Sequence, residues 1–456
     1  MTLISSAPRE PVLFDAALQR AIMFAQAHSK VLGKEPLLVR DIYGRISIAI
    51  DDREPAHKEI RVHLPVLAAK FHAQLGAYSP GESESDVFLL ASERFCPEDL
   101  FKAPDIFSIP DGDGVRLLEQ QLIGKDWQRE AFPKPTCKRA AFYGVKGGVG
   151  RSTALAMLAK HLAEKHDQRV LVLDLDLESP GISSMLLPGS GTTYLGLVDY
   201  LVEQAVGQGD QLSVRRLSAQ SPLFSGAPGW IKVVPAHGAD AGDYLSKLSR
   251  IYQGVPSGPS DFAARLNQAI SWFETQLQPD VVLLDSRAGL HDIAAVTITR
   301  LHAQTFLFAG GTPQTLAAYK LLFAGLHRHP NRVRDYRADL QLVASLVPET
   351  NRTPYLQKLK TGFYDLFADN FYDDESELLQ AEPSSSVTQF SSQSIPESFN
   401  YSQDDPDAPH NPIPINWYRW FLDFDPMGNR EAWQQSEIDA AFGTFLTSAT
   451  SLVLKQ

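Results

Sequence analysis

The sequence predicts an α/β protein with a mainly parallel sheet covered by helices on both faces, preceded by a small α+β domain. Three observations lead to this prediction. Short Val/Leu-rich runs alternate with helical segments through the middle of the chain, an amphipathic segment of helical spacing lies near the start, and two short strands follow that segment. Near-continuous apolar strands that alternate with helices are typical of a parallel sheet buried on both faces.

Length and composition set the limits for this fold. The 456 residues exceed what one hydrophobic core usually serves, and 44% of them are apolar, so we expect two or three folded units. Acidic residues outnumber basic ones, 54 to 42, for a formal charge of −12. This charge disfavours wholesale attraction to nucleic acid or anionic lipid and favours proteins and nucleotides as partners.

Cysteine usage and hydropathy indicate the cellular compartment in which the protein is expected to function. Cys96 and Cys137 are the only cysteines of the sequence and form no CxxC pair, so neither a disulfide framework nor a zinc site is indicated. The N-terminal residues show no basic region followed by an apolar run, and no stretch approaches the roughly 18 apolar residues of a membrane span. We therefore expect a soluble protein of the reducing cytoplasm.

The N-terminal domain is expected to span residues 1–135. Apolar residues recur at helical spacing over 11–33, and residues 37–50 are expected to form two short strands. Further helices are expected over 64–75 and 115–123. The Pro-punctuated stretch AFPKPTCKR then marks a joint. We expect this domain to bind a partner or to regulate the rest of the chain.

The central domain is expected to span residues 136–350 and to contain the parallel sheet. Its predicted strands are the apolar runs at 140–145, 170–175, 231–234, 281–284, 305–308 and 340–347.

The remaining residues, 351–456, are expected to form a C-terminal extension. Within it, the Ser- and Asp-rich stretch 382–411 is expected to be a mobile loop, because it has few apolar residues to offset its ordering entropy. A last helix is expected over about 437–453.

The strongest motif is AAFYGVKGGVGRSTALAMLAKHLAEK, a strand, a glycine-rich turn and an amphipathic helix in succession. Glycines allow a backbone whose N–H groups point at phosphate oxygens at the start of a helix, and a hydroxyl at position 152 would bind Mg²⁺. A turn that only joins strand to helix is the alternative, which the strand–turn–helix context disfavours. The expected nucleotide-binding residues are Lys146, Gly147, Gly148, Val149, Gly150, Arg151, Ser152 and Thr153.

These residues resemble the deviant Walker A ATPases of the ParA/MinD type, whose loop reads KGGxGK[ST] with an extra lysine at its start, here Lys146. VLVLDLDLESPGI (170–182) resembles the switch I segment of that family, and DVVLLDSRAGLHD (280–292) resembles its Walker B motif and switch II, where relatives commonly have DSPAG. The resemblance extends over about residues 138–350. It implies a P-loop NTPase fold, ATP and Mg²⁺ as cofactors, and an ATP-dependent homodimer.

Arg151 stands where the family has a lysine. KGGVGR with the later blocks is similar to a bacterial subgroup of KGGVGR-variant ATPases, which are associated with conflict or antiviral defence loci. Arginine keeps the positive charge and can contact phosphate bidentately, but its planar fork is not a geometric copy of an ammonium. We therefore expect ATP binding to persist and hydrolysis to be slow, with Lys146 taking more of the catalysis. The alternative is a nucleotide-binding relic.

Acidic residues follow two predicted strands beside the loop, where phosphoryl transfer needs charge neutralisation and a positioned water. Asp285 follows VVLL, the place of a Walker B carboxylate that holds the water shell of Mg²⁺. By resemblance, Asp176 orients the attacking water and Asp174 lies nearer the metal. The expected metal set is Ser152, Asp174 and Asp285, and the expected catalytic set is Lys146, Asp176 and Arg151.

Four further polar residues have open roles. Glu178 either shares the positioning of water or is an exposed loop residue. Arg287 either follows the γ-phosphate or forms an ion pair within switch II, and His291 and Asp292 are expected to cap the next helix. The strand ending LVASLVPET lacks an N/TKxD motif for guanine, which favours ATP over GTP, and by resemblance Pro348 and nearby backbone line the base.

Three functions compete. The first is a Mg²⁺-dependent ATPase that dimerises around ATP and signals to an unidentified protein partner, with a defence setting implied by the subgroup. The second is a ParA/MinD-like ATPase that positions DNA or membrane cargo. The dispersed arginines and the sparsely charged last helix disfavour it. The third is an ATP-binding scaffold without hydrolysis.

Overall fold

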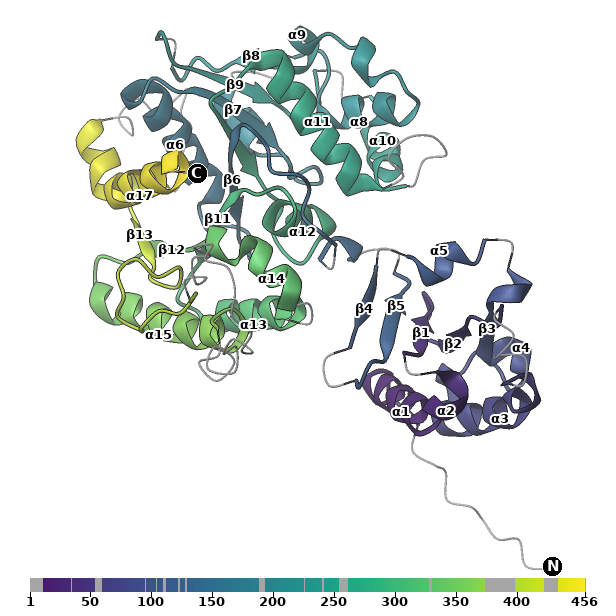
Figure 1. Cartoon of the computed structure of the whole chain (residues 1–456). Helices are drawn as coiled ribbons and strands as arrows, with labels where there is room; N and C mark the ends of the chain where they lie inside the picture. The colour runs from purple at the N-terminus through teal and green to yellow at the C-terminus, as the bar shows by residue number, and fades with distance from the viewer. Residues whose placement is uncertain are drawn as a thin grey trace, which may run out of the picture. The chain divides into compact units, whose positions relative to one another are not determined.

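The computed structural model describes residues 11–455 except 34, 54–59, 95, 104, 110–111, 122–123, 128, 188–192, 225, 240–241, 254–260, 328–329, 374–397 and 422–433. The chain forms two compact units, residues 1–129 and 130–456 (Figure 1). The division between 129 and 130 lies close to the boundary that we predicted near residue 135.

The N-terminal unit is built on a five-stranded sheet of order β3-β2-β1-β5-β4, in which β1 pairs antiparallel with β2 and parallel with β5. Its α-helices and strands are α1 (Phe14–Ala27), α2 (Ser29–Leu32), β1 (Leu37–Arg40), β2 (Ile46–Ile50), α3 (Leu64–Leu75), α4 (Glu84–Val87), β3 (Phe88–Leu90), α5 (Glu98–Phe101), β4 (Ile106–Ser108) and β5 (Arg116–Glu119).

Side chains alternate between the two faces of this sheet. Leu38 and Leu117 lie in the main core with residues of α1 and α3, whereas their neighbours Leu37 and Leu118 belong to a small cluster on the other face with Leu100 of α5. Alternation with a period of two is what strands impose. The helices α1 and α3 therefore cover one face, and among the described residues α5 packs on the other face.

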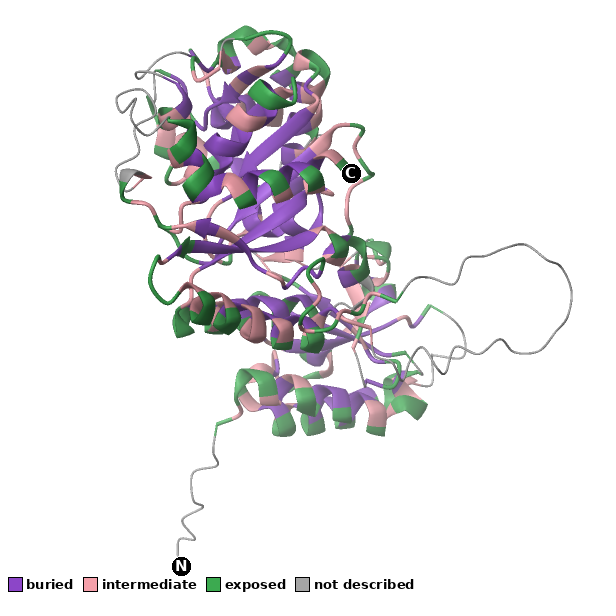
Figure 2. Ribbon diagram, turned by 90° about the vertical axis from the view of Figure 1, so that its left-hand side faces the viewer, coloured by how far each residue is buried: buried purple, intermediate pink, exposed green. Residues whose placement is uncertain are grey.

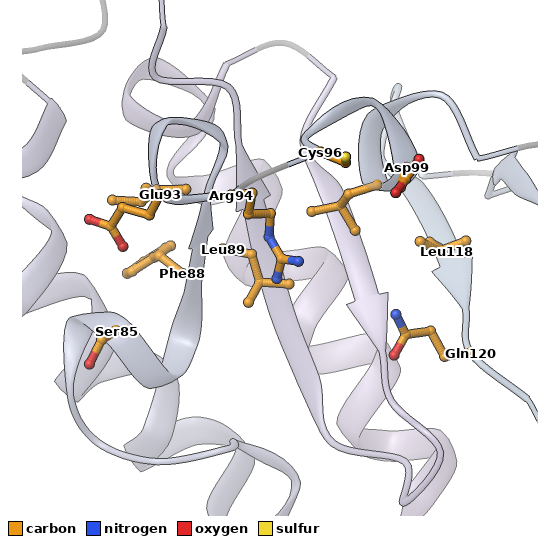
Figure 3. A pocket seen from close by; sticks show the side chains of 11 residues that line it. Ser85, Phe88, Leu89, Glu93, Arg94, Cys96, Asp99, Leu118 and Gln120 are labelled. Atoms are coloured by element: carbon orange, nitrogen blue, oxygen red, sulfur yellow. The ribbon is translucent and has the colours of Figure 1, made fainter.

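That second face contains a hollow of about 720 Å³, shown in Figure 3. Leu89 comes from β3 and Leu118 from β5. The other lining residues are Ser85, Phe88, Leu90, Glu93, Arg94, Cys96, Asp99, Leu100 and Gln120.

The predicted strands over 37–50 and the helix over 64–75 are confirmed. The predicted helix over 115–123 is wrong, because residues 116–119 form β5 in parallel pairing with β1, and residues 122–123 lie outside the described residues. Leu117 and Leu118 are both buried, one on each face, so the pair fits a strand between two covered faces as well as it fits a helix. The strands β3 and β4, three residues each, were not predicted.

The second unit contains an eight-stranded sheet of order β13-β12-β11-β6-β10-β7-β9-β8, parallel except for the short edge strand β8. All six predicted strands are confirmed, and the α/β fold class is confirmed with them. The strands are β6 (Lys138–Tyr143), β7 (Arg169–Asp174), β8 (Ala219–Gln220), β9 (Trp230–Val234), β10 (Val281–Asp285), β11 (Gln304–Ala309), β12 (Leu340–Val347) and β13 (Ile413–Asn416).

Helices cover both faces of this sheet, and its central strands β6, β7, β10 and β11 are almost entirely buried (Figure 2). On β10, Val281 and Leu283 pack toward α6 and α17, while Val282 and Leu284 pack toward α8, α11 and α12. Among the described helices, none has the length and apolar character that a membrane span needs. The helices are α6 (Arg151–Lys165), α7 (Ile182–Leu186), α8 (Leu197–Ala205), α9 (Val214–Leu217), α10 (Tyr244–Ile251), α11 (Phe262–Leu277), α12 (Asp292–Thr299), α13 (Pro313–His327), α14 (Pro330–Tyr336), α15 (Arg352–Asn370) and α17 (Gln435–Lys455).

The described residues of the expected C-terminal extension, 351–456, belong to this unit. β13 pairs with β12, and Phe445 of α17 packs on Phe306 and Phe142 of the sheet, with ring centroids 5.7 and 6.4 Å apart. The C-terminal helix is confirmed as α17.

Only part of the predicted mobile loop over 382–411 can be compared with the structure, because residues 382–397 lie outside the described residues. Residues 398–411 differ from the expectation, since they pack on the unit with Ala408 and His410 fully buried. The His410 ring lies against Tyr364, with centroids 5.2 Å apart, and its Nε2 is 3.1 Å from the carbonyl of Gln403. Aromatic contacts far along the chain, which composition does not reveal, order this part.

Candidate functional site

The glycine-rich loop joins β6, which ends at Tyr143, to α6, which begins at Arg151. Gly148 and Gly150 have φ of +72° and +75°, the left-handed region that favours glycine. At Gly147 and Gly148, no heavy atom of the described residues lies within 4 Å of the position a Cβ would take. The loop therefore opens onto free space at the N-terminus of α6, where backbone N–H groups lack intrahelical partners.

The two cations of the loop have opposite environments. Lys146 is exposed, whereas Arg151 is only 8% exposed. The Nη1 of Arg151 donates to the carbonyl oxygen of Ser286 at 2.7 Å, and its Nη2 lies 3.7 Å from Oδ2 of Asp176. The guanidinium thus lies between the segment after β7 and the segment after β10.

Two buried carboxylates end the strands beside the loop. Asp174 of β7 and Asp285 of β10 are register partners in neighbouring parallel strands, and both are almost completely buried. Ser152 Oγ of α6 donates to Asp285 Oδ2 at 2.7 Å, and Ser183 Oγ donates to Asp174 Oδ2 at 2.5 Å. Oδ1 of Asp285 is buried without a hydrogen-bond partner among the described residues.

Burial raises the pKa of both carboxyls. The neighbouring charge of Asp285 raises the pKa of Asp174 further, while Arg151 and Ser152 act in the opposite direction on the pKa of Asp285. Two acids that resist ionisation side by side favour a cation near them. Mg²⁺ prefers oxygen ligands and typically takes one or two carboxylates together with phosphate oxygens, so Ser152, Asp174 and Asp285 fit this ion.

Asp176 lies two residues beyond β7. Leu175 and Leu177 on either side of it are fully buried in the core, and they anchor the segment. Within the described structure, Oδ1 of Asp176 is buried without a hydrogen-bond partner. Burial raises the pKa of Asp176, and the charges of Arg151 and Arg287 lower it.

Glu178 and Arg287 form an ion pair that links the segment after β7 to the segment after β10, with Arg287 Nη1 2.7 Å from Glu178 Oε1. Of the two roles that we expected for Arg287, the structure has the ion pair, but its partner lies in switch I rather than in switch II. His291 is the N-cap of α12 and accepts from the N–H of Ile293 at 3.4 Å, and Asp292 is the first residue of that helix.

Several contacting residues were missed by sequence reasoning. Tyr252, at the end of α10, donates its hydroxyl to Glu178 Oε1 at 2.7 Å, and Tyr244 of the same helix donates to the carbonyl of Leu177 at 2.5 Å. Glu178 and Tyr252 lie 74 residues apart in sequence, and no local pattern connects them.

Leu346 lies beside the loop at the end of β12, where the register with β13 shifts. It has a φ of +51° and is 44% exposed, and its Cδ2 is 3.8 Å from the position a Cβ would take on Gly150. Pro348, expected near the base, is half-buried two residues further on.

Neither a protein-family model nor a curated protein matches the chain. Among solved structures it is similar to cobyrinic acid a,c-diamide synthase from Mycobacterium smegmatis with bound ADP and magnesium, at 19% identity over 52% of this chain and 83% of that chain, with a TM-score of 0.34. It is also similar to a ParA family ATPase from Chlorobium tepidum, at 14% identity over 53% and 87%, with a TM-score of 0.36. The septum site-determining protein MinD from Pyrococcus horikoshii, complexed with Mg-ADP, matches at 18% identity over 47% and 72%, with a TM-score of 0.31.

Proposed function

We propose that this chain binds ATP with Mg²⁺ at the loop from Lys146 to Thr153 and hydrolyses it as a ParA/MinD-type ATPase. One observation supports this above the others: a loop held open by left-handed glycines faces a buried pair of carboxylates, with Ser152 hydrogen-bonded to one of them. Backbone N–H groups at a helix start bind phosphate, and neighbouring carboxylates bind its metal.

In this proposal the loop backbone binds the phosphates, and Ser152, Asp174 and Asp285 hold Mg²⁺. The ion, when bound, would neutralise charge that develops on the phosphate oxygens. The unpartnered buried oxygen of Asp285 supports this assignment, since such an oxygen is costly unless a cation or a donor satisfies it.

Catalysis is assigned to three residues. Asp176 orients the attacking water, and its unpartnered buried Oδ1 is available for that task. Arg151 moves from the Ser286 carbonyl to a phosphate oxygen when ATP arrives. Lys146 reaches the phosphates of a second subunit, and its exposure at the edge of the loop supports that assignment. The active form is therefore an ATP-dependent homodimer.

We assign the downstream role to a protein partner, in the defence setting that the subgroup resemblance implies. Positioning of DNA or membrane cargo is the second candidate. The apolar side chains of α17 pack on the core of its own unit, which leaves that helix poorly suited to insert into a membrane. Pelleting with DNA or with anionic vesicles, with and without ATP, separates the two roles: ATP-dependent pelleting would favour cargo positioning.

The binding site is tested by Gly148→Val, with Gly207→Val as its matched control. Both glycines have a positive φ and open space where a Cβ would go, so backbone strain is similar, but only Gly148 faces the proposed phosphates. We expect Gly148→Val to lose retention of labelled ATP in the presence of Mg²⁺, and Gly207→Val to keep it.

The same preparations are then assayed for phosphate release. ATP retention by Gly148→Val at the wild-type level would place the nucleotide elsewhere. ATP binding by the wild type without phosphate release would refute hydrolysis and would favour the ATP-binding scaffold.

A further inference from the structure

We infer that Glu178, Arg287 and Tyr252 form a clamp that positions Asp176 for hydrolysis, an inference that rests on the proposed ATPase function. The clamp joins three parts of the second unit: the segment after β7, the segment after β10 and the end of α10. Arg287 Nη1 and the Tyr252 hydroxyl both contact the same carboxylate oxygen, Oε1 of Glu178, each at 2.7 Å.

The clamp residues Glu178 and Arg287 lie in the chain segments that follow two of the proposed metal ligands. Asp174 and Asp285 are register partners at the ends of β7 and β10, and the chain then continues from each strand into a switch segment. Glu178 lies two residues after Asp176, and Arg287 lies two residues after Asp285. The ion pair thus ties the segment that contains Asp176 to the segment that leaves the proposed metal ligand.

The guanidinium of Arg287 forms an ion pair with Glu178. Its partner Glu178 also receives the Tyr252 hydroxyl, and the exposed fractions of the two charged side chains are 31% and 23%. His291 Nε2 is 3.7 Å from the same Oε1, but burial lowers the pKa of His291, so Arg287 supplies the main charge. Arg287 is therefore a positioning residue and not a phosphate ligand.

Among the described residues, Arg151 is the one ion-pair partner of the Asp176 side chain, so the position of Asp176 depends on how its segment is held. Arg151 Nη2 is 3.7 Å away, beyond hydrogen-bond reach, and the backbone turn from Asp176 to Ser179 is closed by one hydrogen bond of 3.2 Å. The buried side chains of Leu175 and Leu177 anchor the segment in the core, and the Tyr244 hydroxyl donates to the carbonyl of Leu177. The clamp holds the part of the segment that follows, at Glu178. A displacement of about 1 Å in a positioned group can reduce turnover on the order of a hundredfold.

The test uses three variants: Glu178→Gln, Arg287→Gln, and a charge-swapped double variant that combines Glu178→Arg and Arg287→Glu. Asp280→Asn is the matched control, because Asp280 forms a similar Arg–carboxylate pair with Arg169 at 2.7 Å, at the opposite ends of the same two strands. For each full-length variant, the ATP dissociation constant, kcat for phosphate release and hydrogen exchange of residues 175–180 and 286–291 are measured.

We expect each single variant to lower kcat about ten- to a hundredfold, to keep the ATP dissociation constant within about threefold, and to speed hydrogen exchange in both segments. The charge swap is expected to recover part of kcat and of the protection, and Asp280→Asn is expected to resemble wild type. Wild-type kcat in both single variants would overturn the inference. A loss of ATP affinity equal to the loss of kcat in Arg287→Gln would overturn it too, since Arg287 would then contact phosphate.

Failure of the proposed function gives a different result. A wild type that binds ATP but releases no phosphate refutes hydrolysis. Hydrogen exchange then still decides whether the clamp holds the two segments, and unchanged exchange in Glu178→Gln and Arg287→Gln would refute the clamp itself.

Discussion

The guanidinium of Arg151 is buried and has partners outside the phosphate loop, the carbonyl of Ser286 and the carboxylate of Asp176. A lysine at this position would have one rotatable ammonium, whereas the planar fork of arginine can direct one nitrogen at a carbonyl and another at a carboxylate. ATP binding would make this side chain exchange a carbonyl for a phosphate oxygen. In the proposed mechanism, Arg151 would therefore link ATP binding to the segments after β7 and β10.

Arg151→Ala is expected to weaken ATP binding by about 1.5 to 3 kcal/mol, roughly ten- to a hundredfold, because it removes a charge-assisted contact. Arg151→Lys keeps the charge and is expected to lose less. Titration with labelled ATP and Mg²⁺ measures both. An unchanged dissociation constant in Arg151→Ala would mean that the side chain stays with Ser286 and Asp176 after ATP binds.

Much of the candidate site was predictable at the scale of residues. The loop, Ser152, Asp174 and Asp285 lie together because parallel strands place their carboxyl ends at one edge, so local motifs are enough to locate them. The orientation of the Arg151 side chain was not predictable, since its partner is a backbone carbonyl with no sequence signature. Tyr252 was missed for the related reason that its contact spans 74 residues.

At the scale of elements, Asp52 fastens the end of β2 to the turn after β3. Its Oδ1 accepts from the N–H of Ser92 at 2.8 Å, and its Oδ2 accepts from the Ser92 hydroxyl at 2.6 Å and from Arg61 at 2.7 Å. Burial acts to raise the pKa of Asp52, but these hydrogen bonds outweigh it and lower the pKa to about 2. The ionised carboxylate is thus what the fold stabilises.

The sign of the pH dependence follows from this pKa. Because it lies below the unfolded value of about 3.9, the stability from Asp52 is present above about pH 4 and is lost as the pH falls through 2. Asp52→Asn is expected to reduce the stability of the N-terminal unit by about 1 to 2 kcal/mol at pH 7, and the difference from wild type should shrink toward pH 2.

Urea unfolding followed by pulse-labelling hydrogen exchange of residues 88–94 measures this difference. Asp99→Asn, at an exposed carboxyl of the same unit, is the control. A deficit in Asp52→Asn that is equally large at pH 7 and pH 2 would show that the ionised carboxylate is not its cause.

Element prediction succeeded where runs were long and failed where they were short. Central strands of the parallel sheet contain runs of at least four consecutive apolar residues, as in residues 281–284 of β10 and residues 170–173 of β7, and these strands were found, whereas the short edge strands β8 and β13 were not. In the N-terminal unit, β3 and β4 have three residues each, too few to show a period, and the Leu117–Leu118 pair fits either helix or strand.

At the scale of the whole molecule, the proposal requires two subunits to share their sites. Lys146 is exposed at the start of the loop, and Asp176 belongs to the same subunit as the loop. A dimer that exchanges lysines across its interface would therefore have each active site built from both chains. Assembly and turnover would then depend on each other.

Asp176→Ala and Lys146→Ala are expected to fail differently. Asp176→Ala should retain ATP and accumulate as a dimer with poor turnover, because Asp176 acts after binding. Lys146→Ala should bind ATP as a monomer and lose both dimerisation and turnover. Light scattering with Mg²⁺-ATP and a phosphate-release assay measure the two properties.

Mixing the two variants provides the internal control. In a mixed dimer one site lacks both residues, while the other keeps its own Asp176 and receives Lys146 from across the interface, so some turnover should return. A wild type that remains monomeric under saturating ATP while it hydrolyses ATP would refute the shared site.

The packing of α17 on α6 has a consequence for biosynthesis. α6 begins at the phosphate loop, and its apolar face shares a core with Phe442 and Phe445 of α17, more than 250 residues later in the chain. While the ribosome is still translating the residues between them, that face has no α17 to cover it. A nascent chain that stops before residue 435 would leave apolar surface beside the loop open to chaperones and proteases. The apolar face of α6 would thus be fully covered only after α17 has been translated.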